Sequence, residues 1–287
     1  MHNIKQMQSL PLSAKIRMTE LRIRQWYEYW DGEVYLSFSG GKDSQVLLHI
    51  IRGLYKDVPA VFVNTGMEFP SIVKHVKEFD NVVWLKPKMS FWRVIEKYGW
   101  PAVSKEQSQF IHELNRTKAE YIINRMLNKK GLWTLSLKWR PLLGSPISHK
   151  CCHYLKKEPA RRYEKLTGRY PMLGIMAAES KMRAQRKQCN IIDGKRPSSA
   201  PLLFWTESDI WEYVKLHNLK LAPPYYEGEK RTGCMFCLFG AHYDNFQRIA
   251  RIKEKYPPLY KVFQKYGGEE MIEKIKACCN TKKKGRK

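Results

Sequence analysis

The fold is indicated by residues 34–51, which read VYLSFSGGKDSQVLLHII. Residues 34–38 are short, aromatic and β-branched, as buried strands often are. Gly40 and Gly41 then mark a tight loop, and residues 46–51 form an apolar segment typical of a helix. We therefore expect a strand, a tight loop and a helix in immediate succession.

The same unit recurs further along the chain. Residues 60–63 predict a second strand and residues 82–85 a third, with a helix between them at residues 71–79. Residues 171–176 predict another strand. Because strands alternate with helices, the predicted fold class is α/β, a parallel twisted sheet with helices on both faces.

Additional segments surround this core. Residues 12–30 predict a helix, and residues 207–216 predict another that is capped by Thr206. A strongly basic, helical stretch interrupts the alternation, and we interpret it as an insertion. The expected organisation is an N-terminal helical segment, a catalytic domain that carries the basic helical insertion, and a C-terminal helical segment with a basic tail, at residues 1–32, 33–245 (insertion at about 104–150) and 246–287.

Composition narrows the class of protein. The 287 residues include 52 Lys and Arg against 27 Asp and Glu, a formal charge of +25, so anionic partners are expected. A hydrophobic content of 43% excludes wholesale disorder. The sequence has no apolar stretch near the roughly 18 residues of a membrane span and no signal-peptide pattern at the N-terminus. Seven cysteines, two pairs of them adjacent, suit reduced thiols or metal ligands better than disulfides. We expect a cytoplasmic protein with no membrane partner.

The loop at residues 39–44, Ser-Gly-Gly-Lys-Asp-Ser, has the features of a phosphate site. Its glycines let the backbone expose consecutive N–H groups, and the following helix adds the positive end of its dipole. Lys42 supplies a charge, and Ser39 and Ser44 supply hydroxyl donors. The Walker pattern does not fit, because Asp43 stands where Ser or Thr would hold magnesium. The plainer alternative is a glycine turn that only joins strand to helix.

This loop resembles the PP-loop of the ATP pyrophosphatases, which bind or cleave ATP between the α and β phosphates. The resemblance implies an adenine nucleotide-binding, Rossmann-like fold of the adenine nucleotide alpha-hydrolase type. It also implies that Lys42, Asp43 and Ser44 are catalytic, with Asp43 positioning Mg²⁺ or the loop. The expected ligand is ATP or adenosine phosphosulfate.

Four of the cysteines suggest a metal centre. Cys234 and Cys237 form a C-x-x-C pair on a turn, and the adjacent Cys151 and Cys152 add two thiols. Four thiolates suit either tetrahedral zinc or a cubane cluster, and a chance C-x-x-C is the alternative to both. Sequential neighbours rarely ligate one small zinc ion comfortably, whereas a cubane offers separate iron corners.

The arrangement is similar to the iron–sulfur-containing branch of the phosphoadenosine phosphosulfate reductase family, over about residues 30–245. The resemblance implies a [4Fe–4S] cluster held by Cys151, Cys152, Cys234 and Cys237. It implies a set of nucleotide-binding residues in the PP-loop, in the loop after the second strand and in the motif around residue 174: Ser37, Ser39, Gly40, Gly41, Lys42, Asp43, Ser44, Asn64, Thr65, Gly66, Glu68, Gly174, Glu179 and Arg183.

The chain also departs from that family. Asn64 stands where the family has Asp, and the arginine expected near Met176 is missing. The C-terminal Glu-Cys-Gly-Leu-His segment, whose cysteine attacks sulfur, is absent as well. Cys278 and Cys279 lie close to the C-terminus, where they either replace that nucleophile or are incidental.

Three functions follow from these observations. The first is ATP-dependent activation of a substrate by adenylation, with release of pyrophosphate, coupled to sulfur transfer; DNA or tRNA and a cysteine desulfurase are its expected partners. The second is reduction of adenosine or phosphoadenosine phosphosulfate with thioredoxin. The third is a non-catalytic, nucleic-acid-binding accessory protein.

Overall fold

The computed structural model describes residues 4–128, 131, 133–229 and 231–280. The chain divides into two compact units. The first comprises Met1–Asn64, Glu68–Lys86 and Pro159–Thr232, and the second comprises Thr65–Met67, Pro87–Glu158 and Gly233–Lys287. The predicted basic insertion at about residues 104–150 falls within the second unit, together with the helices that follow residue 246.

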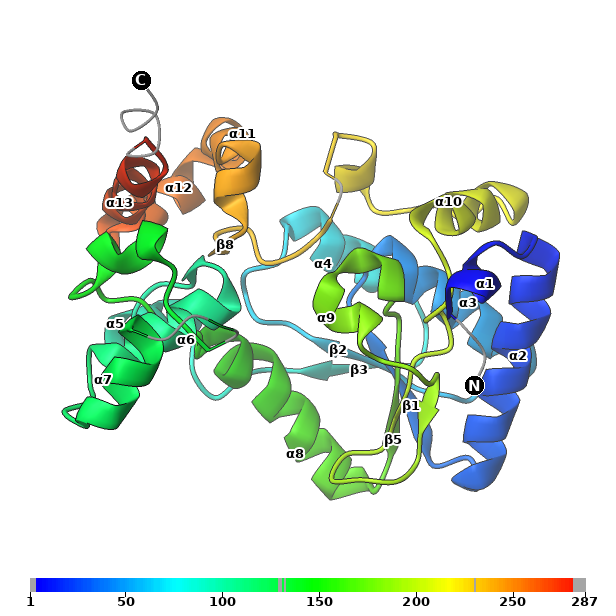
Figure 1. Ribbon diagram of the computed structural model, residues 1–287. Coiled ribbons are helices and arrows are strands. Elements are labelled where there is room, and N and C mark those ends of the chain that lie inside the picture. The colour runs from blue at the N-terminus through cyan, green and yellow to red at the C-terminus, as the bar shows by residue number, and fades with distance from the viewer. Residues whose placement is uncertain (1–3, 129–130, 132, 230, 281–287) are drawn as a thin grey trace. The chain divides into compact units, whose positions relative to one another are not determined.

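The first unit contains a sheet with the strand order β3-β2-β1-β5-β7-β6 (Figure 1). All neighbouring strands are parallel except the pair of β6 and β7, which is antiparallel. The strands are β1 (Val34–Phe38), β2 (Ala60–Val63), β3 (Val82–Leu85), β5 (Tyr170–Leu173), β6 (Asn190–Ile191) and β7 (Ser198–Ser199). The predicted α/β class is therefore confirmed.

Helices flank this sheet. They are α1 (Ile4–Gln8), α2 (Leu12–Tyr29), α3 (Lys42–Leu54), α4 (Pro70–Val76), α8 (Glu158–Thr167), α9 (Lys181–Ala184) and α10 (Glu207–Leu216), with short helices η3 (Ala177–Glu179) and η4 (Pro223–Tyr225). Helix α3 packs against β1, and α2 and α10 pack against α3. Strand β1 is buried along nearly its whole length, as expected for an inner parallel strand.

The predicted elements differ from the observed ones mainly at their ends. Helix α4 begins at Pro70, one residue before the predicted start, because proline is favoured in the first turn of a helix. Strand β5 ends at Leu173, and Gly174 follows it. Helix α10 has the predicted cap, since the Thr206 hydroxyl accepts the Asp209 N–H at 3.4 Å.

The second unit is mainly helical. Its elements are α5 (Phe91–Tyr98), β4 (Ala102–Val103), α6 (Lys105–Leu114), α7 (Glu120–Leu127), η1 (Leu137–Leu142), the π-helix η2 (His153–Lys157), β8 (Leu238–Phe239), η5 (Ala241–Asp244), α11 (Gln247–Lys255), α12 (Pro257–Lys265) and α13 (Gly268–Asn280). Strands β4 and β8 pair in parallel. Buried aromatic rings, such as Phe236 stacked on Phe263 at 4.9 Å between ring centroids, form its core.

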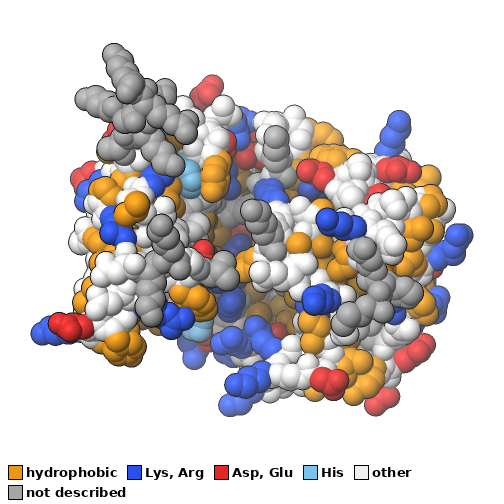
Figure 2. All heavy atoms as spheres, in the orientation of Figure 1, with side chains coloured by type: hydrophobic (Ala, Val, Ile, Leu, Met, Phe, Trp, Pro, Cys, Tyr) orange, Lys and Arg blue, Asp and Glu red, His pale blue; other side chains and the backbone are white. Residues whose placement is uncertain are grey.

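Two surface properties complete the description. Across the described ranges, every helix is too short or too polar to cross a lipid bilayer. Figure 2 shows Lys and Arg side chains gathered below the centre of the visible face, in keeping with the charge of +25.

Candidate active site

The glycine loop lies between the carboxyl end of β1 and the start of α3. Gly40 has a φ of +70°, which favours glycine. A Cβ atom at Gly40 would also lie 2.6 Å from a side-chain carbon of Val76 and 3.0 Å from one of Ile72. Both the backbone conformation and the close packing against α4 therefore require glycine here.

The two serines of the loop hydrogen-bond within it. The Ser44 hydroxyl donates to the carbonyl of Gly41 at 2.9 Å and lies 3.0 Å from the Ser39 hydroxyl. The N–H of Ser39 donates to the Ser44 hydroxyl at 3.2 Å, and the N–H of Gly41 donates to the Ser39 hydroxyl at 3.3 Å. These bonds fix the backbone of the loop.

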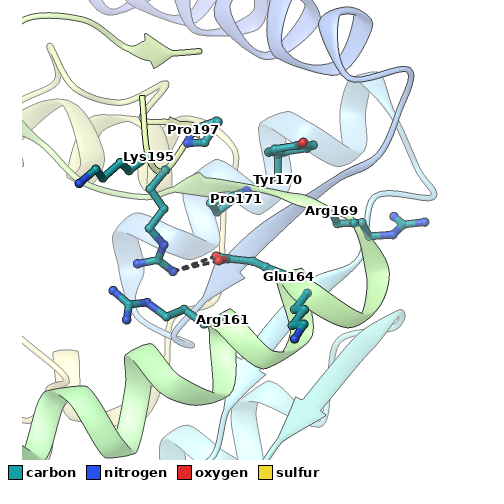
Figure 3. Close-up of a pocket in the computed structure, with 10 residues that line it drawn as sticks. Arg161, Glu164, Arg169, Tyr170, Pro171, Lys195 and Pro197 are labelled. Atoms are coloured by element: carbon teal, nitrogen blue, oxygen red, sulfur yellow. Dashed lines mark hydrogen bonds and ion pairs between the residues drawn. The ribbon is translucent and has the colours of Figure 1, made fainter. Parts of the chain in front are cut away.

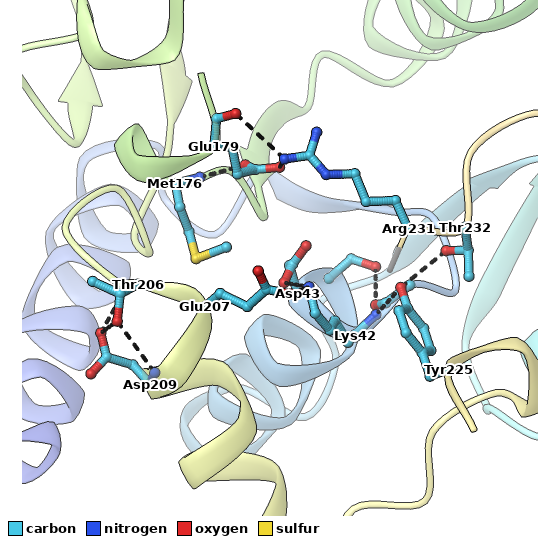
Figure 4. A network of polar contacts seen from close by, with 12 residues as sticks. Lys42, Asp43, Met176, Glu179, Thr206, Glu207, Asp209, Tyr225, Arg231 and Thr232 are labelled. Carbon is cyan, nitrogen blue, oxygen red and sulfur yellow. Dashed lines mark hydrogen bonds and ion pairs between the residues drawn. The ribbon is translucent and has the colours of Figure 1, made fainter. Parts of the chain in front are cut away.

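Lys42 is the charged centre of the loop. Its side chain is buried, and its Nζ lies 3.1 Å from Asp43 Oδ1 and 3.6 Å from Glu207 Oε1. The backbone N–H of Lys42 donates at 2.9 Å to the hydroxyl of Tyr225, which is 3.1 Å from the Thr232 hydroxyl (Figure 4). Burial raises the pKa of Tyr225, so this hydroxyl stays protonated at neutral pH.

A small cavity of about 80 Å³ adjoins this lysine. Its lining is strongly charged: Lys42, Asp43, Met176, Ala178, Glu179, Glu207 and Arg231. A whole nucleotide needs a pocket of roughly 300 Å³ or more, so the cavity has room only for part of one.

Glu179 organises the far wall of the cavity. It forms an ion pair with Arg183 and accepts the N–H of Met176 at 2.9 Å. Arg231 lies 4.0 Å from the same carboxylate. Burial lowers the pKa of Arg183, and the positive charge of Arg231 lowers it further, while Asp43 opposes both. The predicted residues Glu179 and Arg183 thus lie in the same network as Lys42 and Asp43.

Gly174 lies against the loop from the neighbouring strand. A Cβ atom there would be 3.0 Å from the Cα and 3.1 Å from the backbone nitrogen of Ser44. Because Gly174 has no side chain, β5 continues this close to the start of α3 without displacing the backbone of Ser44. Ser37 lies in the same sheet, paired in register with Val61 and Leu173.

The nucleotide-binding residues predicted after the second strand divide between the two units. Asn64 follows β2 directly, and its N–H donates to the carbonyl of Leu85 at 2.9 Å. Asn64 and Glu68 belong to the unit with the glycine loop, whereas Thr65 and Gly66 belong to the other unit. Thr65 is buried, and its hydroxyl accepts the N–H of Met67 at 3.2 Å.

Four polar side chains of this site were not predicted as nucleotide contacts: Glu207, Tyr225, Arg231 and Thr232. Glu207 could have been found, because it follows the helix cap at Thr206. Tyr225 carries no local signal, since it lies on a short Pro-Pro-Tyr turn distant from the loop in sequence.

The four predicted metal ligands all lie in the second unit. The thiol of Cys151 donates to the sulfur of Cys152, 4.0 Å away. This hydrogen bond lowers the pKa of Cys152 to about 6, and nearby lysines contribute, while the pKa of Cys151 is raised. Burial raises the pKa of Cys237 to about 11, and the charges of Cys234 and Cys152 add to the effect. The thiols are therefore near enough to act on one another electrostatically.

The donor set is thiol-rich, but the sulfurs do not surround one point. In the part of the chain that the structure describes, no group of three or more His, Cys, Asp or Glu is arranged to hold a metal ion. The described chain thus brings four thiols together in one unit without forming a single-ion site. Four neighbouring thiols remain the donor type that an iron–sulfur cluster uses.

The remaining cysteines differ from these four. Cys278 is buried in α13, and burial raises the pKa of its thiol. Cys189 is buried in the first unit, and burial raises its pKa too. All seven cysteines lie in the described ranges, and none of them is in a disulfide bond.

A glycine loop at the carboxyl ends of the strands of a mostly parallel sheet, flanked by helices, defines an α/β protein with a Rossmann-like arrangement. The model of the phosphoadenosine phosphosulfate reductase domain matches residues 33–238, and the chain belongs to this family.

Three individual proteins illustrate how far this chain is similar to others. An uncharacterized protein of Methanocaldococcus jannaschii is 27% identical over 260 residues, which are 86% of this chain and 52% of that protein. The chain thus spans about half the length of this relative. The adenosine 5′-phosphosulfate reductase of Anoxybacillus flavithermus is 23% identical over 80% of this chain and 84% of the reductase. The solved phosphoadenylyl-sulfate reductase of Candida auris is 16% identical, with a TM-score of 0.47, over 79% of this chain and 96% of that chain.

Proposed function

We propose that the chain binds ATP at residues 39–44 and activates a substrate for sulfur transfer by adenylation. In this reaction a nucleophilic oxygen of the substrate attacks the α-phosphorus, the bond between the α and β phosphates breaks, and pyrophosphate leaves. A sulfur nucleophile then displaces AMP. The observation that carries the proposal is the buried Lys42, which adjoins a charged cavity beyond the carboxyl end of β1.

Positioning and charge neutralisation supply most of the catalysis in such a step. Lys42 holds a phosphate, while the backbone of residues 40–44 and the positive end of α3 provide N–H donors. Across the cavity, Arg183 and Arg231 share the single carboxylate of Glu179, so this group of three side chains carries a net positive charge. Gly174 lets β5 pack closely against the start of α3.

The cavity also fits magnesium. Mg²⁺ is commonly bound by one or two carboxylates together with substrate phosphates. Asp43 and Glu207 both line the cavity within 4 Å of Lys42 Nζ, so they are the residues that would hold the ion. When bound, Mg²⁺ would neutralise the charge of the triphosphate.

The four thiols of the second unit fit a [4Fe–4S] cluster by donor type, with Cys151, Cys152, Cys234 and Cys237 as ligands. Such a cluster would bind or relay sulfur. A cysteine desulfurase would supply that sulfur, and the charge of +25 favours a polyanionic acceptor such as DNA or tRNA. Cysteines that form no disulfide suit a reducing compartment, which favours the cytoplasm.

Reduction of phosphosulfate is the second candidate, because the Anoxybacillus relative named as a reductase covers 80% of this chain. The structure disfavours one of its two candidate C-terminal nucleophiles, Cys278. Cys278 is buried with a raised pKa, whereas an attacking thiol has to be accessible and ionised. Thioredoxin would be the partner of this reaction.

Two assays on anaerobically purified protein separate the candidates. With labelled ATP, a sulfur source and tRNA or DNA as the acceptor, we expect pyrophosphate. Both ATP binding and pyrophosphate release should be lost in Lys42→Ala but kept in Lys56→Ala, where an exposed lysine of the same unit is removed. With phosphosulfate and thioredoxin, we expect no sulfite. Sulfite that disappears in Cys278→Ser/Cys279→Ser would establish the reductase instead. Nucleic-acid binding without either activity would indicate an accessory role.

The cluster is tested by colour and iron content. Brown protein with a broad visible absorbance band is expected, and Cys234→Ser should lose the band. Cys189→Ser, which removes a buried cysteine of the other unit, should keep it. A colourless protein with one zinc per chain would contradict the cluster.

A further inference from the structure

A second and larger concavity lies in the first unit, with a volume of about 540 Å³ (Figure 3). Figure 3 shows Arg161 and Glu164 on helix α8 and Lys195 on the segment between β6 and β7. Tyr170 and Pro171, at the start of β5, form its floor. None of these residues belongs to the glycine loop.

The concavity lies at the amino ends of the strands, and the glycine loop lies at their carboxyl ends. Val34 and Tyr170 are register partners at the amino ends of β1 and β5. The glycine loop follows the carboxyl end of β1, and a strand of this length spans roughly 15 Å. A ligand in the concavity therefore does not compete for the loop.

The lining carries an excess of positive charge. It contains five cations and one carboxylate: Arg161, Lys165, Arg169, Lys195, Arg196 and Glu164. Glu164 is already neutralised, because it pairs with Arg196 at 2.9 Å and accepts the hydroxyl of Tyr35 at 2.9 Å.

Three of the five cations are uncompensated. Arg169 is paired with Glu33 at 3.3 Å, as Arg196 is with Glu164. Within the described ranges, no carboxylate forms an ion pair with Arg161, Lys165 or Lys195, and all three side chains are exposed. Cations without an ion-pair partner around a hollow attract anions, and this attraction extends over about one Debye length.

We propose that this concavity binds backbone phosphates of a nucleic acid. Arginine and lysine are the side chains that bind phosphate most effectively. Their spread over an open hollow suits successive phosphates of a chain better than one small anion, which is usually held by buried groups. This proposal rests on the proposed function in one respect, namely that the nucleic acid would be held because it is the sulfur acceptor.

The test compares two triple variants that remove the same charge. Arg161→Ala/Lys165→Ala/Lys195→Ala empties the concavity of its unpaired cations, and Arg17→Ala/Lys56→Ala/Lys215→Ala removes three exposed cations elsewhere on the same unit. Binding of a fluorescein-labelled DNA duplex of about 20 base pairs is followed by anisotropy over a series of salt concentrations. ATP binding is measured on the same samples.

We expect the concavity variant to bind the duplex at least about tenfold more weakly. Its affinity should also depend less on salt, with the magnitude of the slope of log K against log salt reduced by about 2–3. The control should change the affinity less than about threefold, and ATP binding should be unchanged in both. Equal losses in the two variants would show that only net charge matters and would overturn the proposal. Failure of Lys42→Ala to affect ATP would instead contradict the nucleotide site and leave this surface standing.

A free phosphate compound is the other possible source of the same chemistry. Titration of inorganic phosphate, followed by ³¹P NMR, distinguishes it. If the concavity variant lost phosphate binding but kept full duplex binding, the site would belong to a small phosphate ligand, and the nucleic-acid assignment would be wrong.

Discussion

Tyr225 shows how one hydroxyl can occupy a phosphate position of the proposed nucleotide site. It accepts the N–H of Lys42 at 2.9 Å, the type of donor that a phosphate oxygen would take in a glycine loop. A Cβ on Gly41 would lie 2.9 Å from both this hydroxyl and that of Thr232, so the two groups lie directly over the loop. A phosphate that bonds to Lys42 N–H has to displace the tyrosine.

Tyr225→Phe should therefore tighten ATP binding. The variant leaves the Lys42 N–H without its protein acceptor, and one such hydrogen bond contributes about 1 kcal/mol, which corresponds to roughly fivefold in Kd. Calorimetric titration of ATP measures the change, with Tyr121→Phe, an exposed tyrosine of the other unit, as the control. Weaker binding in Tyr225→Phe would show that the hydroxyl contacts the nucleotide instead of excluding it.

The sequence predicts local residues of this site better than distant ones. The glycines and Lys42 are recognisable because their chemistry is confined to a six-residue loop. Tyr225 lies 183 residues from Lys42 along the chain, and its role depends on the fold alone. For the same reason, the close approach of Gly174 to Ser44 is visible only in three dimensions.

At the scale of elements, a buried ion pair joins two helices. Lys15 of α2 lies 2.7 Å from Asp209 of α10, and both side chains are buried. Lys15 also donates to the carbonyl of Gln8 at 2.7 Å, while Asp209 accepts the N–H of Thr206 at 2.6 Å. The pair thus links the start of α10 to α2, next to the helix that follows the glycine loop.

Lys15→Ala should destabilise the protein by about 3 kcal/mol, because it leaves a buried carboxylate without its cation. Denaturant unfolding, followed by circular dichroism, measures the loss. Lys220→Ala is the control: it removes a lysine 3.7 Å from Glu78 in an exposed pair, which should cost less than about 1 kcal/mol. Equal small effects for both variants would mean that the buried pair contributes nothing to stability.

Strands β1, β2 and β3 were predictable because their sequence pattern is local, whereas β6 and β7, at one edge of the sheet, were not. Residues 34–38, 60–63 and 82–85 were predicted at their observed bounds. Strands β6 and β7 have two residues each, too few to show any hydrophobic period, and their pairing depends on long-range contacts. The second unit is assembled from three separated segments, an arrangement that composition does not reveal.

For the whole molecule, the charge of +25 is the dominant long-range term. Like charges repel within a compact state and weaken it, and salt screens them, with a Debye length of about 30 Å at 0.01 M and about 10 Å at 0.1 M. Ion pairs are screened as well, but 52 cations face only 27 anions, so repulsion outweighs attraction.

The melting temperature should therefore rise by a few degrees between about 0.02 M and 0.2 M sodium chloride, the range over which the screening length falls most. Differential scanning fluorimetry measures it, and sodium sulfate at equal ionic strength is the control. Equal rises in both salts indicate screening alone. Sulfate also strengthens apolar burial in proteins generally. Anion binding is therefore indicated only by a larger rise in sulfate that shrinks in the triple variant of Arg161, Lys165 and Lys195, whose cations have no ion-pair partner among the described residues. A melting temperature that falls with added chloride would show that the cations of this chain are already balanced by their neighbours, contrary to the excess in its sequence.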